Sequence, residues 1–79
     1  MNISFKSGLV KLDNGMFINP THVVSIEYKY KNDKQGCRLD LINGSSYSTE
    51  KLMPDNIAAA CIKAQAESRI VRCDDIINQ

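Results

Sequence analysis

Apolar and polar residues alternate along much of the first fifty positions of the chain. A period of two is typical of β-strands with one face buried and one face exposed. The clearest example is the segment 23–31, which places four apolar or aromatic residues on one face and polar residues on the other: Val24, Ile26, Tyr28 and Tyr30. This segment is therefore predicted to be a strand.

Shorter segments continue the pattern on both sides of this strand. Residues 9–13 and 16–19 predict the two arms of a first hairpin, and Asn19–His22 breaks the second arm at a proline. The segment 37–42 alternates again. Residues 45–49 are rich in Ser and Thr and have little to bury, which predicts a strand at the edge of a sheet.

The dipeptide Asn-Gly occurs twice between apolar residues, at 14–15 and at 43–44. Asn and Gly tolerate the positive φ angles of a two-residue type I′ turn, which suits the twist of paired strands. We therefore expect a tight hairpin at each position, with Leu12 facing Phe17 across the first one. The polar segment 32–36 is expected to be a loop.

The period changes after Leu52, where a helix is predicted. Pro54 suits the first turn of a helix, and Asp55 complements the positive end of the helix dipole. Apolar residues then follow at helical spacing: Met53, Ile57, Ala60, Cys61 and Ala64. Five alanines between residues 58 and 66 favour a slim helix that can lie close to a sheet.

Two arrangements are open for the last part of the chain. A second apolar stripe fits one long helix that runs to the C-terminus. Alternatively, Arg69–Cys73 forms a strand that is followed by a short helical turn. We favour a break near Ser68, because the β-branched residues Ile70 and Val71 lower the helix propensity there.

These elements predict a single small α+β domain over residues 1–79. We expect four to five short antiparallel strands in a curled sheet or small open barrel, with one C-terminal helix. A chain of 79 residues buries only about 60–65% of its unfolded surface, so its stability is marginal. Small domains often gain stability by self-association, which leaves a homo-oligomer and a monomer both open.

Composition limits the partners and the compartment. Ten basic and nine acidic residues leave a formal net charge of +1, which gives no general attraction to nucleic acid or to anionic membranes. The longest apolar run, 57–62, is far shorter than the ~20 residues that span a bilayer. The N-terminus has no pattern of a secretory signal, and three widely spaced cysteines suit a reducing compartment, so we expect a cytoplasmic protein.

Candidate catalytic and metal-binding groups are few. His22 is the only histidine, and no local signature pairs it with Cys37 or Cys61 as a nucleophile. The cysteines are 24 and 12 residues apart, whereas structural zinc sites usually take two ligands within two to four residues. None of the four glycines opens the predicted helix, as a phosphate-binding loop requires. We expect no enzymatic activity, no metal and no cofactor.

One cluster of residues is a candidate for partner binding. It combines cations with aromatic rings between positions 28 and 38, and we call it the Tyr/Lys cluster: Tyr28, Lys29, Tyr30, Lys31, Lys34 and Arg38. On a hairpin, Lys29 and Lys31 share a face that Arg38 joins from the neighbouring strand. Cations on phosphates and rings against bases bind nucleic-acid strands in this way. Strand alternation, however, sends the tyrosines to the opposite face. This favours an exposed strand face with solvated lysines and with tyrosines that cap the core, and it leaves nucleic acid and an acidic protein partner as the two binding alternatives.

The chain also resembles a known family. Two motifs carry the resemblance, namely Leu12-x-Asn14-Gly15-x-Phe17-Ile18-Asn19-Pro20-x-His22-Val23-x-x-Ile26-Glu27 and Leu39-x-Leu41-x-Asn43-Gly44-x-x-Tyr47. This pattern looks like the FlbD family of small flagellar proteins over residues 8–67, and that family has no catalytic residues to transfer. The segment 19–27 with the second Asn-Gly is also similar to the last part of LytTR-type DNA-binding domains, whose base-contacting residues lie largely outside this stretch. Residues 1–7 and 68–79 have no counterpart.

Taken together, the residues and the resemblance predict a non-enzymatic accessory or regulatory protein that binds another protein. The surfaces available for binding are the Tyr/Lys cluster, the edge at 45–49 and the C-terminal segment. An edge strand has unpaired backbone groups that can pair with another chain. The alternative is a small nucleic-acid-binding regulator that uses the same cluster.

Overall fold

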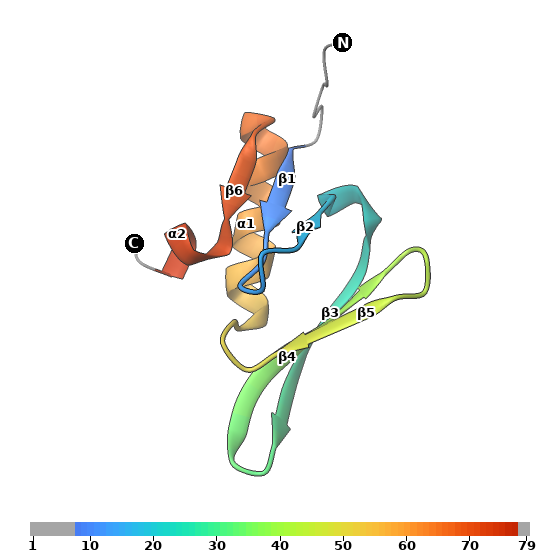
Figure 1. Cartoon of the computed structure of the whole chain (residues 1–79), viewed down its shortest axis with the longest axis vertical. Helices are drawn as coiled ribbons and strands as arrows, with labels where there is room; N and C mark the ends of the chain where they lie inside the picture. The colour runs from blue at the N-terminus through green and yellow to red at the C-terminus, as the bar shows by residue number, and fades with distance from the viewer. Residues whose placement is uncertain (1–7, 78–79) are drawn as a thin grey trace.

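The computed structural model describes residues 8–77 and contains six strands in two three-stranded sheets, together with helices (Figure 1). The predicted α+β class is confirmed. The predicted four to five strands in one curled sheet or barrel are wrong, because the described residues form six strands in two sheets. Residues 1–7, in which no secretory signal was found, and residues 78–79 lie outside the described residues.

The first sheet has the strand order β2-β1-β6. Its strands are short: β1 spans Leu9–Lys11, β2 spans Phe17–Ile18 and β6 spans Ile70–Arg72. β1 is antiparallel to β2 but parallel to β6, with Val10 opposite Val71. A purely antiparallel arrangement was therefore wrong, since the chain returns to this sheet through a helix and so enters β6 in the direction of β1.

The long helix α1 spans Pro54–Glu67 and packs against β1 and β6. It ends at Ser68, whose φ of 52° is left-handed, and β6 and the short helix α2 (Cys73–Ile77) follow. The predicted break near Ser68 is confirmed, and one long helix to the C-terminus is excluded. The β-branched residues of β6 pack in the sheet, where their stiff side chains fit well.

The second sheet is antiparallel, with the order β3-β4-β5. β3 spans Val23–Lys31, β4 spans Lys34–Leu41 and β5 spans Ser46–Thr49. The predicted strand at 23–31 is confirmed, and β5 lies at an edge as predicted. The predicted loop at 32–36 is wrong, because only two of these residues turn and the other three begin β4.

Two residues with left-handed backbone conformations, Asn32 and Asp33, form the turn between β3 and β4. Asn32 and Asp33 have φ angles of 54° and 61°, and they join Lys31 directly to its register partner Lys34. Two consecutive residues with positive φ are typical of a type I′ turn. The turn type expected at the Asn-Gly pairs therefore occurs at Asn-Asp instead.

The two Asn-Gly pairs lie in hairpin loops of three residues. In the first loop, Leu12 N donates to Met16 O at 2.8 Å, so residues 13–15 form the loop. Only the glycines have positive φ, 86° at Gly15 and 88° at Gly44, which is the usual geometry of a type I turn closed by a left-handed residue. The asparagines of the two pairs do not have a positive φ. Instead, the side chain of Asn14 accepts a hydrogen bond from Met16 N at 2.9 Å.

The longer loop changes the register of the first hairpin. Phe17 lies opposite Lys11 and Ile18 lies opposite Val10, so the predicted pairing of Leu12 with Phe17 is wrong. A shift of one residue moves a side chain to the other face of a strand. Ile18 is consequently buried, whereas the Phe17 side chain is 50% exposed.

A bulge at the start of β3 corrects a second prediction. The 3₁₀ helix η1 (Pro20–His22) breaks the chain after β2, as the proline predicted. In β3 the register then shifts between Val23 and Ser25, which leaves Val24 as the extra residue. Val24 is 65% exposed and does not share a buried face with Ile26, while Val23 packs against the core.

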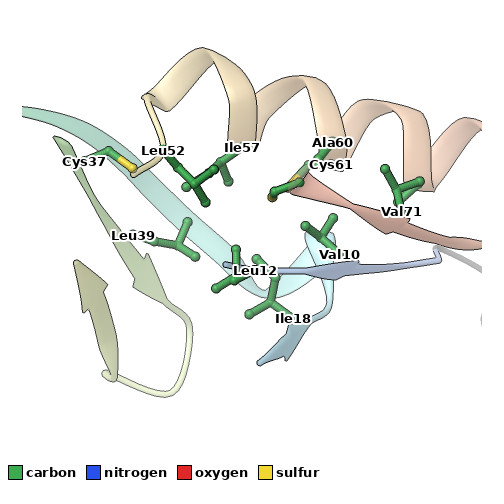
Figure 2. Packing of buried hydrophobic residues seen from close by; sticks show 12 residues of the cluster. Val10, Leu12, Ile18, Cys37, Leu39, Leu52, Ile57, Ala60, Cys61 and Val71 are labelled. Atoms are coloured by element: carbon green, nitrogen blue, oxygen red, sulfur yellow. The ribbon is translucent and has the colours of Figure 1, made fainter. Parts of the chain in front are cut away.

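The core lies between α1 and the two sheets (Figure 2). Within residues 8–77, twelve buried side chains form this core, and they come from both sheets, from α1 and from the segments beside them: Val10, Leu12, Ile18, Cys37, Leu39, Leu52, Ile57, Ala60, Cys61, Ala64, Val71 and Cys73. The predicted inner face of the helix is confirmed by the burial of four of its five residues. No helix within residues 8–77 is both long enough and apolar enough to cross a membrane.

Candidate functional site

The hairpin β3–β4 is the candidate functional site because it extends beyond the rest of its sheet. β3 and β4 pair as far as Lys31 and Lys34, whereas β5 pairs with β4 only between Cys37 and Asp40. Figure 1 shows the far end of this hairpin projecting from the body of the molecule. We call residues 28–37 the hairpin tip.

The register places the four cations of the Tyr/Lys cluster on one face. Glu27 lies opposite Arg38, Lys29 opposite Gly36 and Lys31 opposite Lys34. Since paired residues of an antiparallel ladder point to the same face, Lys29, Lys31, Lys34 and Arg38 share a face, as the alternation predicted. The sequence alone did not add Lys34 to this face, because the segment that contains it was expected to be a loop.

Tyr28 and Tyr30 lie on the opposite face of the hairpin. They continue the face that Ile26 and Leu39 present to the core, but at the tip no other element covers them, and they are 55% and 60% exposed. The expectation that these tyrosines cap the core is therefore wrong. The tip exposes two aromatic rings on one side and four cations on the other.

Most of the cations have an acidic partner on the same face. Three exposed ion pairs join them to carboxylates: Lys29–Glu27 at 3.3 Å, Lys34–Glu50 at 3.7 Å and Arg38–Asp40 at 3.0 Å. The hydroxyl of Ser25 donates to Asp40 at 2.9 Å, and this bond, followed by Arg38, holds the pKa of Asp40 below its ordinary value. Among residues 8–77, Lys31 has no carboxylate within ion-pair distance.

A carboxylate from the first hairpin holds β5 in place. Asp13 accepts hydrogen bonds from the hydroxyl of Tyr47 and, at 2.9 Å, from Oγ1 of Thr49. Burial, together with the bond to Asp13, raises the pKa of Tyr47 to about 12. Asp13 thereby links the β1–β2 loop to the second sheet, across 34 and 36 positions of sequence. No local sequence pattern announces such a contact, and Asp13 was not among the predicted residues.

A cleft of about 730 Å³ lies where β5 ends beside the hairpin tip. Its walls include residues of β4 and β5 and the two residues after β5, Glu50 and Lys51. Gly36 permits this close arrangement, since a Cβ at this position would lie 2.1 Å from the carbonyl oxygen of Thr49. A volume of this size is within the range of ligand-binding clefts.

The cysteines are parts of the core. All three are unpaired and buried, whereas His22 is exposed. Burial raises the pKa of Cys37, Cys61 and Cys73, in the last case to about 12, which suppresses the reactive thiolate near neutral pH. Within the described part of the chain, no three His, Cys, Asp or Glu side chains are grouped as metal ligands.

Comparisons with family models, with curated proteins and with solved structures found no match. The resemblance to the FlbD family, and the shorter similarity to LytTR-type domains, therefore stays a prediction. A functional proposal must accordingly depend on the geometry of the hairpin and the cleft beside it.

Proposed function

We propose that this protein is a non-enzymatic accessory or regulatory protein that acts by binding another protein through the hairpin β3–β4. The observation that carries this proposal is the projection of the hairpin tip beyond β5, with Tyr28 and Tyr30 exposed. Tyrosine is enriched at protein interfaces, because its ring adds apolar contact area and its hydroxyl forms hydrogen bonds. A projecting hairpin brings both of its faces to a partner.

The strand edges of the second sheet support the same function. β5 is an edge strand, and β3 is the other edge of this sheet. An exposed edge offers backbone N–H and C=O groups to an extended segment of a second chain, which is a common mode of peptide recognition.

Charge pairing favours a protein partner over nucleic acid. The alternative function, a small nucleic-acid-binding regulator, gains most when rings and cations converge on one strand of nucleic acid. Here Tyr28 and Tyr30 lie on the face opposite the lysines, and three of the four cations are paired with carboxylates. The net charge of +1 adds no general attraction to phosphate.

The proposal includes a cytoplasmic location, since three unpaired cysteines suit a reducing compartment. Self-association is a separate prediction. Light scattering coupled to size-exclusion chromatography measures it directly, and a strictly monomeric protein would restrict the proposal to a heteromeric partner.

The test is quantitative capture of binding proteins from host cells with matched variants. The test variant replaces Lys29, Lys31 and Arg38 by Ala, and the control variant replaces Lys63, Arg69 and Arg72, which lie outside the hairpin. Both sets of side chains include exposed cations, so we expect each variant to fold with a stability within about 1 kcal/mol of the wild type.

We expect the wild type and the control to enrich the same protein and the test variant to lose it. Equal capture by all three forms, or capture of nucleic acid in place of protein, would contradict the proposal. If the test variant unfolded instead, thermal denaturation would reveal it, and the cations would have to be structural supports rather than a binding surface.

A further inference from the structure

We infer that the cleft beside Gln35 binds an extended acidic segment of the partner protein, an inference that rests on the proposed protein-binding function. The cleft combines an open strand edge with an excess of positive charge.

The open edge lies at Gln35. Backbone groups of successive residues in an antiparallel strand point alternately to the two neighbouring strands. Lys34 pairs with Lys31 across the two-residue turn, so Lys34 directs its N–H and C=O toward β3, and Gln35 directs its own to the other side. The hydrogen bond from Leu41 N to Ser45 O, at 2.9 Å, shows that the backbone N–H and C=O groups of the odd-numbered residues of β4 point toward β5.

β5 does not reach Gln35. Its last pair with β4 joins Thr49 to Cys37, and the chain then leaves toward α1 (Figure 1). Within residues 8–77, no strand pairs with β4 at Gln35 on this side. The cleft is lined by Gln35 and by residues on both sides of it, so a backbone lying in the cleft would meet the N–H and C=O of Gln35.

The side chains around this edge attract negative charge. Five basic residues line the cleft: Lys29, Lys31, Lys34, Arg38 and Lys51. Two of them, Lys29 and Arg38, are paired with the carboxylates of Glu27 and Asp40, which lie outside the lining. The lining contains two carboxylates, of which Asp13 is engaged by the hydroxyls of β5 and Glu50 is paired with Lys34 at 3.7 Å. Both side chains of this ion pair are 66% exposed, and exposed pairs are weak, so an incoming carboxylate can replace Glu50 on Lys34 at little cost.

An acidic peptide satisfies both features at once. Its backbone can exchange two hydrogen bonds with Gln35, and its carboxylates can reach Lys31 and Lys51, which have no ion pair within the described residues. The phosphates of a nucleic acid would use the cations, but its sugar-phosphate backbone has no repeating N–H and C=O groups that match a strand edge. The exposed tyrosines of the tip also lie on the face away from the lysines. The inferred ligand is therefore a peptide.

The experiment measures fluorescence anisotropy of a fluorescein-labelled octapeptide that alternates glutamate with threonine. The full chain is titrated at low and at physiological salt. Three other probes separate the causes of binding: the same octapeptide with lysine in place of glutamate, the acidic octapeptide with alternate backbone nitrogens methylated, and a single-stranded DNA octamer. The matched protein variants are Lys31→Glu in the cleft and Lys63→Glu on α1, which make the same change of charge.

We expect the acidic octapeptide to bind, more weakly as salt increases, and Lys31→Glu to weaken it by about tenfold while Lys63→Glu changes it little. Backbone methylation should weaken binding to a similar extent. The inference would be overturned if the acidic octapeptide failed to bind at low salt, if the methylated peptide or the DNA bound equally well, or if both variants had the same effect. The acidic octapeptide could fail to bind while the variant with Ala at Lys29, Lys31 and Arg38 still lost its captured protein. The inference about the cleft would then be wrong, and the proposed protein-binding function would remain.

Discussion

Asp13, in the loop between β1 and β2, joins the first hairpin to the second sheet through partly buried hydrogen bonds. Its carboxylate accepts hydrogen bonds from Tyr47 and Thr49, both on the edge strand β5. Tyr47 also packs against the core, so both its ring and its hydroxyl attach β5 to the rest of the fold. Hydrogen bonds to a charged acceptor are stronger than neutral ones, and an edge strand of four residues has few other attachments.

Replacing Tyr47 by Phe tests this link. Tyr47→Phe keeps the ring but removes the donor, and we expect the free energy of unfolding to fall by about 1–2 kcal/mol. Urea denaturation measures the change. Tyr28→Phe is the matched control, because Tyr28 is 55% exposed at the hairpin tip, and we expect a change of less than about 0.5 kcal/mol. Equal effects of the two substitutions would contradict a structural role for the Asp13–Tyr47 bond.

Alkaline pH should destabilise the folded protein. The pKa of Tyr47 is raised from 10.0 to about 12 and that of Cys73 from 9.0 to about 12, so the unfolded chain releases both protons before the folded chain does. Their contribution to stability is complete below the unfolded pKa values and is lost as the pH rises toward 12.

Urea denaturation at a series of pH values measures this loss. We expect the free energy of unfolding to decrease between pH 9 and pH 12, and to decrease less steeply in Tyr47→Phe above pH 10. A variant whose pH dependence matched that of the wild type would show that the Tyr47 hydroxyl is not held protonated by the fold.

At the scale of elements, the three hairpins within residues 8–77 differ in their turns. The two hairpins with Asn-Gly have three-residue loops in which glycine alone is left-handed, and the projecting hairpin has the left-handed pair Asn32–Asp33. Aspartate is less suited to positive φ than glycine, so the turn of the projecting hairpin is not the most stable one available.

Substitution at Asp33 should therefore stabilise the protein. Asp33→Gly creates the preferred pair of a type I′ turn, and we expect the free energy of unfolding to increase by about 1 kcal/mol, after the loss of an exposed hydrogen bond from Tyr30 at 3.3 Å. Gly44→Ala should have the opposite effect, because Gly44 has a φ of 88°, which alanine adopts only with strain. We expect this substitution to lower the free energy of unfolding by about 1 kcal/mol or more. Thermal or urea denaturation that ranked the two variants in reverse would refute this assignment of turns.

The sequence pattern predicts most elements but not their register. Alternation located β3, and the Ser- and Thr-rich composition after the second Asn-Gly pair located the edge strand β5. The stiffness of Ile70 and Val71 located the break after α1. The predicted type I′ turn at each Asn-Gly pair was wrong, because Asn-Gly is compatible with a three-residue loop as well as with a two-residue one. The residue types alone do not determine which of the two φ angles is positive. The bulge at Val24 and the parallel pairing of β6 depend on contacts between distant segments, which local periodicity does not contain.

For the candidate site, the sequence predicted the shared face of Lys29, Lys31 and Arg38, since alternation determines the face of each residue on a strand. It did not predict the cleft. That cavity depends on where β5 ends relative to β4 and on the approach of Thr49 to Gly36, both of which are set by tertiary packing. Asp13 was missed for the same reason.

At the scale of the whole molecule, the described residues form an elongated body with principal extents of 47 × 31 × 19 Å. The core and α1 occupy one part of this length, and the hairpin tip projects from it (Figure 1). A projecting hairpin adds surface without adding to the core, which is costly for so short a chain. Under the proposed function, a partner protein covers this surface.

Site-specific photocrosslinking in host cells tests the central claim most directly. A photoreactive phenylalanine analogue replaces Gln35 at the cleft in one variant and Ile62, which is 67% exposed on α1, in a control. We predict a discrete protein crosslink from position 35, competed by the acidic octapeptide, and none of the same size from position 62. Crosslinks to nucleic acid, or the same protein crosslink from both positions, would contradict the claim that this protein works by binding a protein partner at the hairpin.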